Sequence, residues 1–154
     1  MKTKIVFVCH GNICRSTMAE FLFRDMVEKK GAAERFEITS RATSTEELGN
    51  PVHPGTRRVL ERIGISCKGK YAQQITGREC DDADLIVVMD GHNRRNLAPF
   101  IGSNGHKVSA LLEWAGLDRD ISDPWYTGNF EDTYRDVVMG LEGLWKGLSE
   151  RNEK

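Results

Sequence analysis

Cys9 and Arg15 are the residues of this sequence whose types and spacing first suggest chemistry. They belong to the segment Cys9–Ser16, which reads CHGNICRS. The backbone N–H groups of a tight loop at a helix N-terminus, together with the helix dipole, bind an anion. Gly11 and Asn12 tolerate the positive φ that such a loop needs, and Arg15 can hold phosphate oxygens with its planar fork. The segment therefore predicts a phosphate-binding loop.

Cys9 lies at the mouth of this loop, where its side chain can act as a nucleophile. The helix dipole, the loop amides and Arg15 favour the thiolate form, which is the attacking species. Ser16 can donate a hydrogen bond to that thiolate, cap the helix, or do both. A C-x5-R pattern recurs by chance, so the prediction of a phosphate-binding loop also depends on the strand before this segment and the helix after it. A Walker loop and a dinucleotide fingerprint are excluded, because neither G-K-[ST] nor G-x-G-x-x-G occurs.

Alternating strand and helix patterns must position this loop. Lys4–Val8 is a short apolar, β-branched run typical of a buried parallel strand. After the loop, Met18, Leu22 and Met26 recur at helical spacing, and Gly31 is placed to end that helix. Similar patterns predict strands at Phe36–Thr39, Leu85–Met89 and Lys107–Ser109, and helices at about Pro54–Gly64, Asn93–Phe100 and Asn129–Ser149.

Four strands interleaved with helices predict an α/β fold: an open four-stranded parallel sheet with helices on both faces. Sheets of this kind bind ligands at the carboxyl ends of their strands, and the Cys9–Arg15 loop leaves the first strand at such an end. The 154 residues contain no linker, repeat or low-complexity segment. We therefore predict one domain, residues 1–154.

Composition and charge argue against several classes of partner. The chain is 39% hydrophobic and 29% charged, and its net charge of −1 gives no reason to expect a nucleic acid or an anionic membrane surface. No stretch approaches the roughly 18 apolar residues of a membrane span, and the N-terminus lacks the apolar core of a secretory signal. The sequence predicts a cytoplasmic protein, in a compartment where thiols stay reduced.

The four cysteines then need an explanation other than a disulfide framework. No C-x2-C pair occurs, so neither a zinc site nor any other metal site is predicted. Cys67 and Cys80 are interpreted as small buried hydrophobic residues. Cys9 and Cys14 differ from them because both belong to the predicted phosphate-binding loop.

The loop sequence CHGNICRS resembles the active-site signature of the low-molecular-weight protein tyrosine phosphatases. The resemblance extends to Asp123-Pro124 downstream, and to Asp84–Asp90, which is similar to the strand before the family's second ligand-side loop. Chain length and element order also fit, so the resemblance covers essentially the whole sequence. It implies a phosphotyrosine protein phosphatase I-like fold and a phosphotyrosine-containing protein or peptide as the substrate, with small aryl phosphates also hydrolysed.

The resemblance also implies a role for each site residue. Cys9 would attack phosphorus and form a cysteinyl-phosphate, while Arg15 would stabilise the transferring group. Asp123 would protonate the phenolic oxygen and then act as base for the hydrolytic water. From the residues alone Asp123 is a weaker candidate, because most Asp-Pro pairs only begin turns. No cofactor or metal is required, and the implied phosphate-binding residues are His10, Gly11, Asn12, Ile13, Cys14, Arg15 and Ser16.

Three further residues are predicted to line the mouth of the substrate site. Trp125 and Tyr126 are consecutive aromatics without core periodicity, which suits walls for a flat phenyl ring, although Trp125 could equally pack beneath its loop. Leu48, in the variable Thr45–Asn50 segment, is placed on the opposite wall. Cys14 resembles the family's second loop cysteine, which can form a reversible disulfide with the nucleophile under oxidation.

The chain departs from the family pattern at two positions. Thr17 stands where the family usually has Pro after Arg-Ser, which could loosen the loop slightly without contacting substrate. Arg41 stands in a segment that usually reads Ser-Ala-Gly, and a bulky side chain near the mouth could alter which peptides fit. The sequence leaves the physiological substrate and the oligomeric state open, although a monomer, with a weak dimer possible, is the simplest expectation.

Rival functions remain on the same scaffold. A phosphoarginine phosphatase is the nearest, but relatives with that activity carry Thr where this chain has Ile13, and an apolar side chain favours a phenyl ring over a guanidinium. A thioredoxin-linked arsenate reductase could use Cys67 and Cys80 as relay cysteines, but that class keeps its two relay cysteines closer together in a mobile segment. A non-catalytic phosphate-binding module would need neither the nucleophile nor the acid that the sequence supplies.

Overall fold

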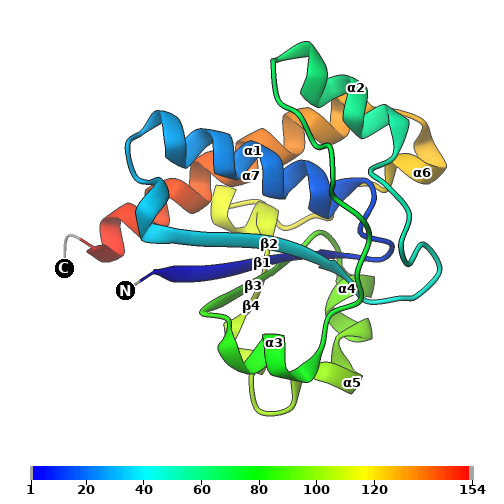
Figure 1. Ribbon diagram of the computed structural model, residues 1–154. Helices are drawn as coiled ribbons and strands as arrows, with labels where there is room; N and C mark the ends of the chain where they lie inside the picture. Colours follow the sequence, from blue (N-terminus) through cyan, green and yellow to red (C-terminus); the bar gives the residue numbers. More distant parts are fainter. Residues whose placement is uncertain (1, 153–154) are drawn as a thin grey trace.

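Four strands alternate with helices along the chain in the computed structural model of the protein, which describes residues 2–152 (Figure 1). The strands are β1 (Thr3–Cys9), β2 (Phe36–Ala42), β3 (Leu85–Val88) and β4 (Val108–Ala110). The helices are α1 (Arg15–Lys29), α2 (Pro54–Arg62), α3 (Gly77–Asp82), α4 (Gly91–Asn96), α5 (Ala98–Ile101), α6 (Pro124–Thr127) and α7 (Phe130–Asn152), with short 3-10 turns at Ala33–Arg35, Gly105–Lys107 and Leu111–Ala115.

The strands form one parallel sheet in the order β2-β1-β3-β4. The central strands β1 and β3 are buried on both faces over Ile5–Cys9 and Leu85–Val88, which is why they read as continuous apolar runs. Val6 pairs with Thr39 on one side and with Ile86 on the other. The predicted four-stranded parallel sheet is confirmed, and its carboxyl edge carries Cys9.

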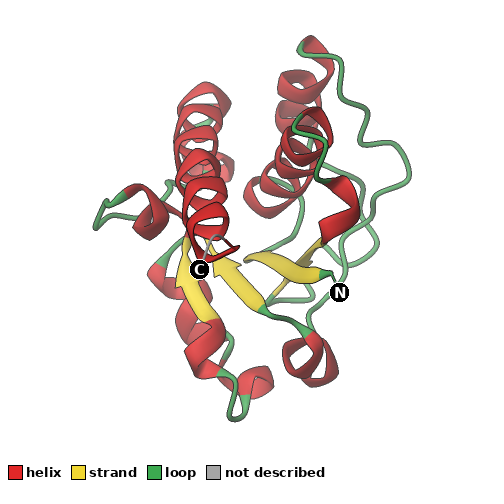
Figure 2. Ribbon diagram, turned by 90° about the vertical axis from the view of Figure 1, so that its left-hand side faces the viewer, coloured by secondary structure: helices red, strands yellow, loops and turns green. Residues whose placement is uncertain are grey.

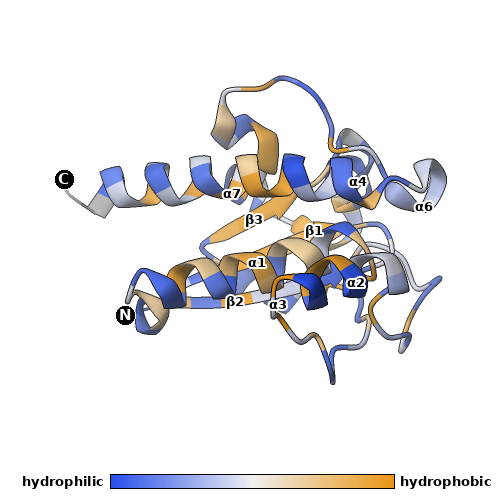
Figure 3. Ribbon diagram, turned by 90° about the horizontal axis from the view of Figure 1, so that it is seen from above, coloured by the Kyte–Doolittle hydropathy of each residue, from blue (hydrophilic) through white to orange (hydrophobic). Residues whose placement is uncertain are grey.

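Helices cover both faces of the sheet, as predicted (Figure 2). The larger core lies between the sheet and the layer of α1, α2 and α7, and includes edge-to-face contacts of Phe23 with Phe7 and Phe36 at centroid distances of 6.0 and 5.8 Å. The smaller core lies on the other face, against α3 and α5. Figure 3 shows that β1 and β3 are apolar, and that apolar and polar residues alternate along α1 and α7. Within residues 2–152, no helix combines the length and apolar character that a membrane span requires.

Several short elements differ from the sequence prediction. The single helix predicted at Asn93–Phe100 is two helices, α4 and α5, and α4 begins earlier because Asp90 caps it through the Asn93 N–H at 2.8 Å. The helices α3 and α6 and the 3-10 turn Leu111–Ala115 were not predicted. A Thr76–Glu79 capping box marks the start of α3 in the sequence, but six residues are too few to show a helical period.

Three glycines on α7 let the turn Leu111–Ala115 pack directly against its backbone. A Cβ at Gly143 would lie 2.2 Å from the Trp114 carbonyl oxygen, and one at Gly147 would lie 2.6 Å from the Trp114 ring. Gly140 faces Leu111 in the same way, at 2.5 Å. This turn leads into the segment that carries Ile121 and Asp123, so the close approach helps to place that segment.

Gly143→Ala is therefore expected to lower the free energy of unfolding by about 3 kcal/mol, because the added methyl group meets backbone rather than a movable side chain. Urea denaturation measures the change. Glu142→Ala, at the exposed neighbouring position of the same helix, is the control and should change stability by less than about 0.5 kcal/mol. Equal stability of the two variants would contradict the close packing of this turn.

Candidate active site

The loop between β1 and α1 wraps around the Cys9 sulfur. Cys9 Sγ lies 3.0 Å from Ser16 Oγ, and the backbone N–H groups of Asn12 and Ser16 point to it from 3.3 and 3.5 Å. Asn12 has a φ of 60°, in the left-handed region that asparagine tolerates better than most residues. Two backbone N–H groups point at the sulfur and the Ser16 hydroxyl lies beside it, so the geometry suits a nucleophile.

A chain of buried polar groups holds Asn12 from below. Its Nδ2 donates to Ser16 Oγ at 2.8 Å and to Ser40 Oγ at 2.9 Å, and the Ser40 hydroxyl donates to Glu20 Oε1 at 2.5 Å. Glu20 is buried and its charge is compensated by Lys70, whose Nζ lies 2.9 Å away. Burial lowers the pKa of Lys70, and the neighbouring carboxylate of Glu20 opposes that shift. The network fixes the strained residue and, through Ser16, the hydroxyl beside Cys9.

Arg15 is 2% exposed and reaches from α1 to the ends of two distant segments. Its Nη1 donates to Asp90 Oδ2 at 2.6 Å and to the Ile121 carbonyl at 2.9 Å, and its Nη2 lies 3.4 Å from Asp123 Oδ2. Burial alone would lower the pKa of Arg15, but the charges of Cys9 and Asp90 raise it above its ordinary value. The guanidinium therefore stays charged beside the nucleophile.

The pKa of Asp90 responds in the opposite direction. Burial would raise it, but the Arg15 guanidinium, 2.6 Å away, holds it below its ordinary value. Asp90 therefore remains an anchor for the arginine rather than a proton donor. The Nε of Arg15 is buried without a hydrogen-bond partner among residues 2–152. Arg15 itself lines the pocket described below.

Asp123 stands at the start of α6, in the extended conformation predicted for a residue before proline. Its Oδ1 accepts a hydrogen bond from the Trp125 N–H at 3.0 Å, which turns the carboxylate towards Arg15. The side chain is 24% exposed, so it is open to both substrate and water. An acid in this position can protonate a leaving group above Cys9.

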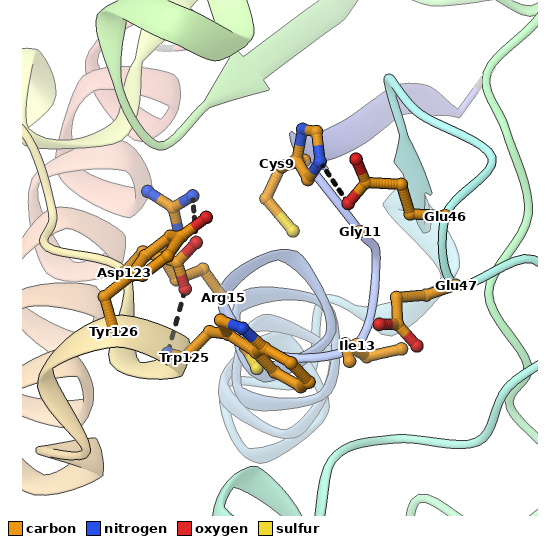
Figure 4. Close-up of a pocket in the computed structure, with 11 residues that line it drawn as sticks. Cys9, Gly11, Ile13, Arg15, Glu46, Glu47, Asp123, Trp125 and Tyr126 are labelled. Atoms are coloured by element: carbon orange, nitrogen blue, oxygen red, sulfur yellow. Dashed lines mark hydrogen bonds and ion pairs between the residues drawn. The ribbon is translucent and has the colours of Figure 1, made fainter.

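These groups surround one cavity of about 90 Å³ (Figure 4). Trp125 and Tyr126 line its aromatic side and are 55% and 84% exposed, so Trp125 does not pack beneath its loop. His53 supports Trp125, with ring centroids 5.6 Å apart, and stacks on Phe130 at 4.9 Å. The lining residues are Cys9, His10, Gly11, Ile13, Cys14, Arg15, Glu46, Glu47, Asp123, Trp125 and Tyr126.

Comparison with known proteins agrees with this arrangement. The family described as low molecular weight phosphotyrosine protein phosphatase matches residues 4–154. The low molecular weight protein-tyrosine-phosphatase YfkJ of Bacillus subtilis is 38% identical over 152 residues, which cover 97% of each chain. The chain belongs to this phosphatase family.

Solved structures of similar phosphatases share the fold. The crystal structure of YfkJ from Bacillus subtilis superposes with a TM-score of 0.93 at 37% identity, covering 98% of this chain and 97% of that one. The low molecular weight protein tyrosine phosphatase SP-PTP from Streptococcus pyogenes gives a TM-score of 0.84 at 38% identity, covering 96% and 93%. The expected family and its phosphatase activity are thereby confirmed.

Most site residues predicted for this phosphatase meet at the pocket. Asn12 and Ser16 are the exceptions within the loop, because both are buried beneath it, where the hydrogen bond between their side chains stabilises the loop conformation. Leu48 is 59% exposed and does not line the cavity. The turn that joins the Leu48 N–H to the Thr45 carbonyl presents Glu46 and Glu47 to the pocket instead.

Three residues of this site were not identified from the sequence: Glu46 and Glu47, which line the pocket, and Asp90, which holds Arg15. Glu46 and Glu47 gave no signal, because their segment has no periodicity. Asp90 follows a predicted buried strand directly, and the rule that ligands bind at carboxyl ends of strands could have identified it.

Thr17 and Arg41, the two departures from the family pattern, do not line the pocket. Arg41 was expected near the mouth, and the structure corrects this: strand alternation turns it to the opposite face of β2 from Ser40, where it donates to Glu79 at 2.7 Å. Thr17 is fully buried, and its hydroxyl donates to the Cys14 carbonyl at 3.1 Å. This bond stabilises the first turn of α1 without the proline, and Thr17 does not line the pocket.

His53 makes the stability of this phosphatase depend on pH. Its Nδ1 accepts the Gly55 N–H at 3.0 Å and caps α2. Burial and the charge of Arg58 lower its pKa below the ordinary 6.5, although Glu47 and Asp123 act in the opposite sense. The folded protein therefore binds this proton more weakly than the unfolded chain. The stabilisation is complete above pH about 6.5 and is lost as pH falls through the folded pKa.

His53→Asn is expected to remove this part of the pH dependence, since asparagine keeps a cap acceptor and does not titrate. The free energy of unfolding, measured by urea denaturation between about pH 7.5 and 5, should fall more steeply for the native protein than for the variant. Parallel slopes for the two proteins would show that His53 does not bind its proton more weakly when folded.

Proposed function

We propose that this phosphatase hydrolyses phosphotyrosine in proteins and peptides, together with small aryl phosphates, through a covalent intermediate on Cys9. The Cys9 thiolate attacks phosphorus, the P–O bond to the phenol breaks, and Asp123 gives its proton to the leaving oxygen. Water then attacks phosphorus as Asp123 accepts its proton, and the P–S bond breaks to restore the thiolate. Arg15 and the loop N–H groups stabilise the charge on the transferring group in both steps.

The observation that carries this proposal is the unpartnered, buried Nε of Arg15 in the same pocket as Cys9 and Asp123. It supplies a fixed donor for a phosphate oxygen next to the nucleophile. Ile13 also lines the pocket, and its side chain offers a phenyl ring an apolar contact but a guanidinium no hydrogen-bond partner. This contact favours phosphotyrosine over phosphoarginine, which remains the alternative substrate.

The arsenate reductase alternative is weakened by the positions of its candidate relay cysteines. Cys67 belongs to the core on the α1 and α7 face of the sheet, whereas Cys80 belongs to the core on the α3 and α5 face. Both are buried, and the sheet separates them from each other. A thiol relay between them would have to cross the sheet.

Phosphate release from a phosphotyrosine peptide tests the proposal, with a phosphoarginine peptide of the same sequence run alongside under reducing conditions with chelator present. Fast release from phosphotyrosine alone supports it. Turnover of the phosphoarginine peptide alone would contradict the inference that Ile13 favours phosphotyrosine. No turnover of either peptide would overturn the proposed reaction.

Cys14 is proposed to protect the nucleophile from irreversible oxidation. Burial raises the pKa of the Cys14 thiol far above its ordinary value, and the negative charge of Cys9 adds to the shift, so Cys14 does not compete as a nucleophile. Oxidation of Cys9 to a neutral sulfenic acid would remove that charge, and attack by Cys14 would form a disulfide with loss of water. All four cysteines are free among residues 2–152, which also supports action in the reducing cytoplasm.

Cys14→Ser should accordingly recover less activity than the native protein after peroxide treatment followed by excess thiol. Without the second thiol, the sulfenic acid on Cys9 proceeds to the irreversible sulfinic acid. Recovered phosphate release, as a fraction of the untreated rate, is the measurement. Equal recovery of the two proteins would contradict a protective disulfide.

A further inference from the structure

The mouth of the pocket has two chemically different walls. Figure 4 shows Trp125 and Tyr126 on one side of Cys9, and the carboxylates of Glu46 and Glu47 on the other. The aromatic wall suits the phenyl ring of a phosphotyrosine. The carboxylate wall has no part in the reaction, and an anionic substrate alone gives no reason for it.

Both carboxylates are open to a ligand and are held in place by the loop itself. Glu46 is 70% exposed and bonds His10 Nε2 at 2.9 Å, whereas Glu47 accepts from Asn50 Nδ2 at 2.6 Å. The Cγ of Glu47 also packs against Gly11, only 3.2 Å from the position that a Cβ there would occupy. Among residues 2–152, neither carboxylate forms an ion pair with a lysine or arginine.

The position of the phosphate fixes which part of a substrate meets these carboxylates. Arg15 is 2% exposed, lines the pocket floor and has an unpartnered Nε, so a phosphate oxygen is expected there. The tyrosine ring then extends outward along Trp125. The residues that flank the phosphotyrosine then lie at the rim of the pocket, of which Glu46 and Glu47 form one side.

We propose that Glu46 and Glu47 form a subsite for a lysine or arginine side chain next to the phosphotyrosine. The inference rests on the proposed function and narrows its substrate class to phosphotyrosine with basic neighbours. A basic neighbour gains an attraction at the rim, whereas an acidic neighbour is repelled by the same two carboxylates. The pocket thus combines a cationic floor for phosphate with an anionic rim for the flanking residues.

Two phosphotyrosine peptides of equal length test the subsite, one with lysine and one with glutamate at the positions flanking the phosphotyrosine. The native protein should favour the lysine peptide in kcat/KM by about tenfold, from about threefold for each carboxylate. The preference should shrink as ionic strength rises from about 0.02 M to about 0.5 M, because salt screens exposed charges. The double variant Glu46→Gln, Glu47→Gln should bring the ratio close to one.

Glu34→Gln is the matched control, because Glu34 is exposed in the turn that leads into the amino end of β2, at the edge of the sheet away from the pocket. It should keep the native ratio. A ratio of one in the native protein, or an unchanged ratio in the double variant, overturns the subsite. Hydrolysis of p-nitrophenyl phosphate separates the failure of the subsite from the failure of the proposed function. If the protein hydrolyses p-nitrophenyl phosphate but shows no preference between the two peptides, only the subsite is rejected. No turnover of any substrate rejects the proposed function itself.

Discussion

Cys9→Ser is expected to lower kcat for phosphate release from a phosphotyrosine peptide by at least about 10⁴-fold. The proposed nucleophile is the sulfur to which two backbone N–H groups point, and a serine hydroxyl is a far weaker nucleophile at neutral pH, so the attacking group is lost. The loop should keep its shape, because oxygen is smaller than sulfur and Ser16 can still donate to it. Inorganic phosphate should therefore still raise the melting temperature of the variant.

Cys67→Ser provides the control for this experiment. Cys67 is also a buried thiol, but it lies in the core against α2 and does not line the active-site pocket. The variant should keep kcat within about twofold, since a substitution away from the site acts on stability rather than on chemistry. A Cys9→Ser protein that retained more than about 1% of native kcat would contradict the nucleophilic role.

The phosphate-binding loop could be predicted because its parts are consecutive in the sequence. Strand, tight loop and helix follow one another from Thr3 to Lys29, so periodicity and local conformational preference were sufficient. The sheet could be predicted for the same reason, since its central strands are uninterrupted apolar runs. Short helices such as α3 and α6 could not, because four to six residues show no period.

The walls of the site depend on contacts that no local pattern reveals. Glu46 and Glu47 reach the pocket through a turn in an aperiodic segment, and the nearest apolar residue, Leu48, was taken for the wall instead. Arg41 was misplaced because the sequence does not show which face of β2 it occupies at the sheet edge. The partners of Arg15 lie 75 and 108 residues away, so only the folded chain brings them together.

Arg15→Lys is expected to lower kcat/KM on a phosphotyrosine peptide by about 10³-fold, although the charge is kept. The guanidinium uses Nη1 for Asp90 and Ile121 and points Nη2 at Asp123, and its Nε has no partner among residues 2–152, so we propose that Nε binds phosphate. A lysine ammonium is one compact charge and cannot hold the carboxylate anchor and a phosphate oxygen in fixed directions at once. If it stays with Asp90, transition-state stabilisation is lost. If it turns to phosphate, a partly buried carboxylate is left without its partner.

Steady-state kinetics and urea denaturation of the same protein distinguish these two outcomes. If the lysine ammonium stays paired with Asp90, the free energy of unfolding should be nearly native. If Asp90 loses its partner, the free energy of unfolding should fall by about 3 kcal/mol, because breaking a buried pair leaves an uncompensated buried charge. Arg62→Lys, at an exposed arginine that pairs with Glu131 on the surface, is the control and should leave kcat/KM within about twofold. A loss of less than about tenfold for Arg15→Lys would mean that charge alone, without the directed Nε donor, is enough to bind the transferring phosphate.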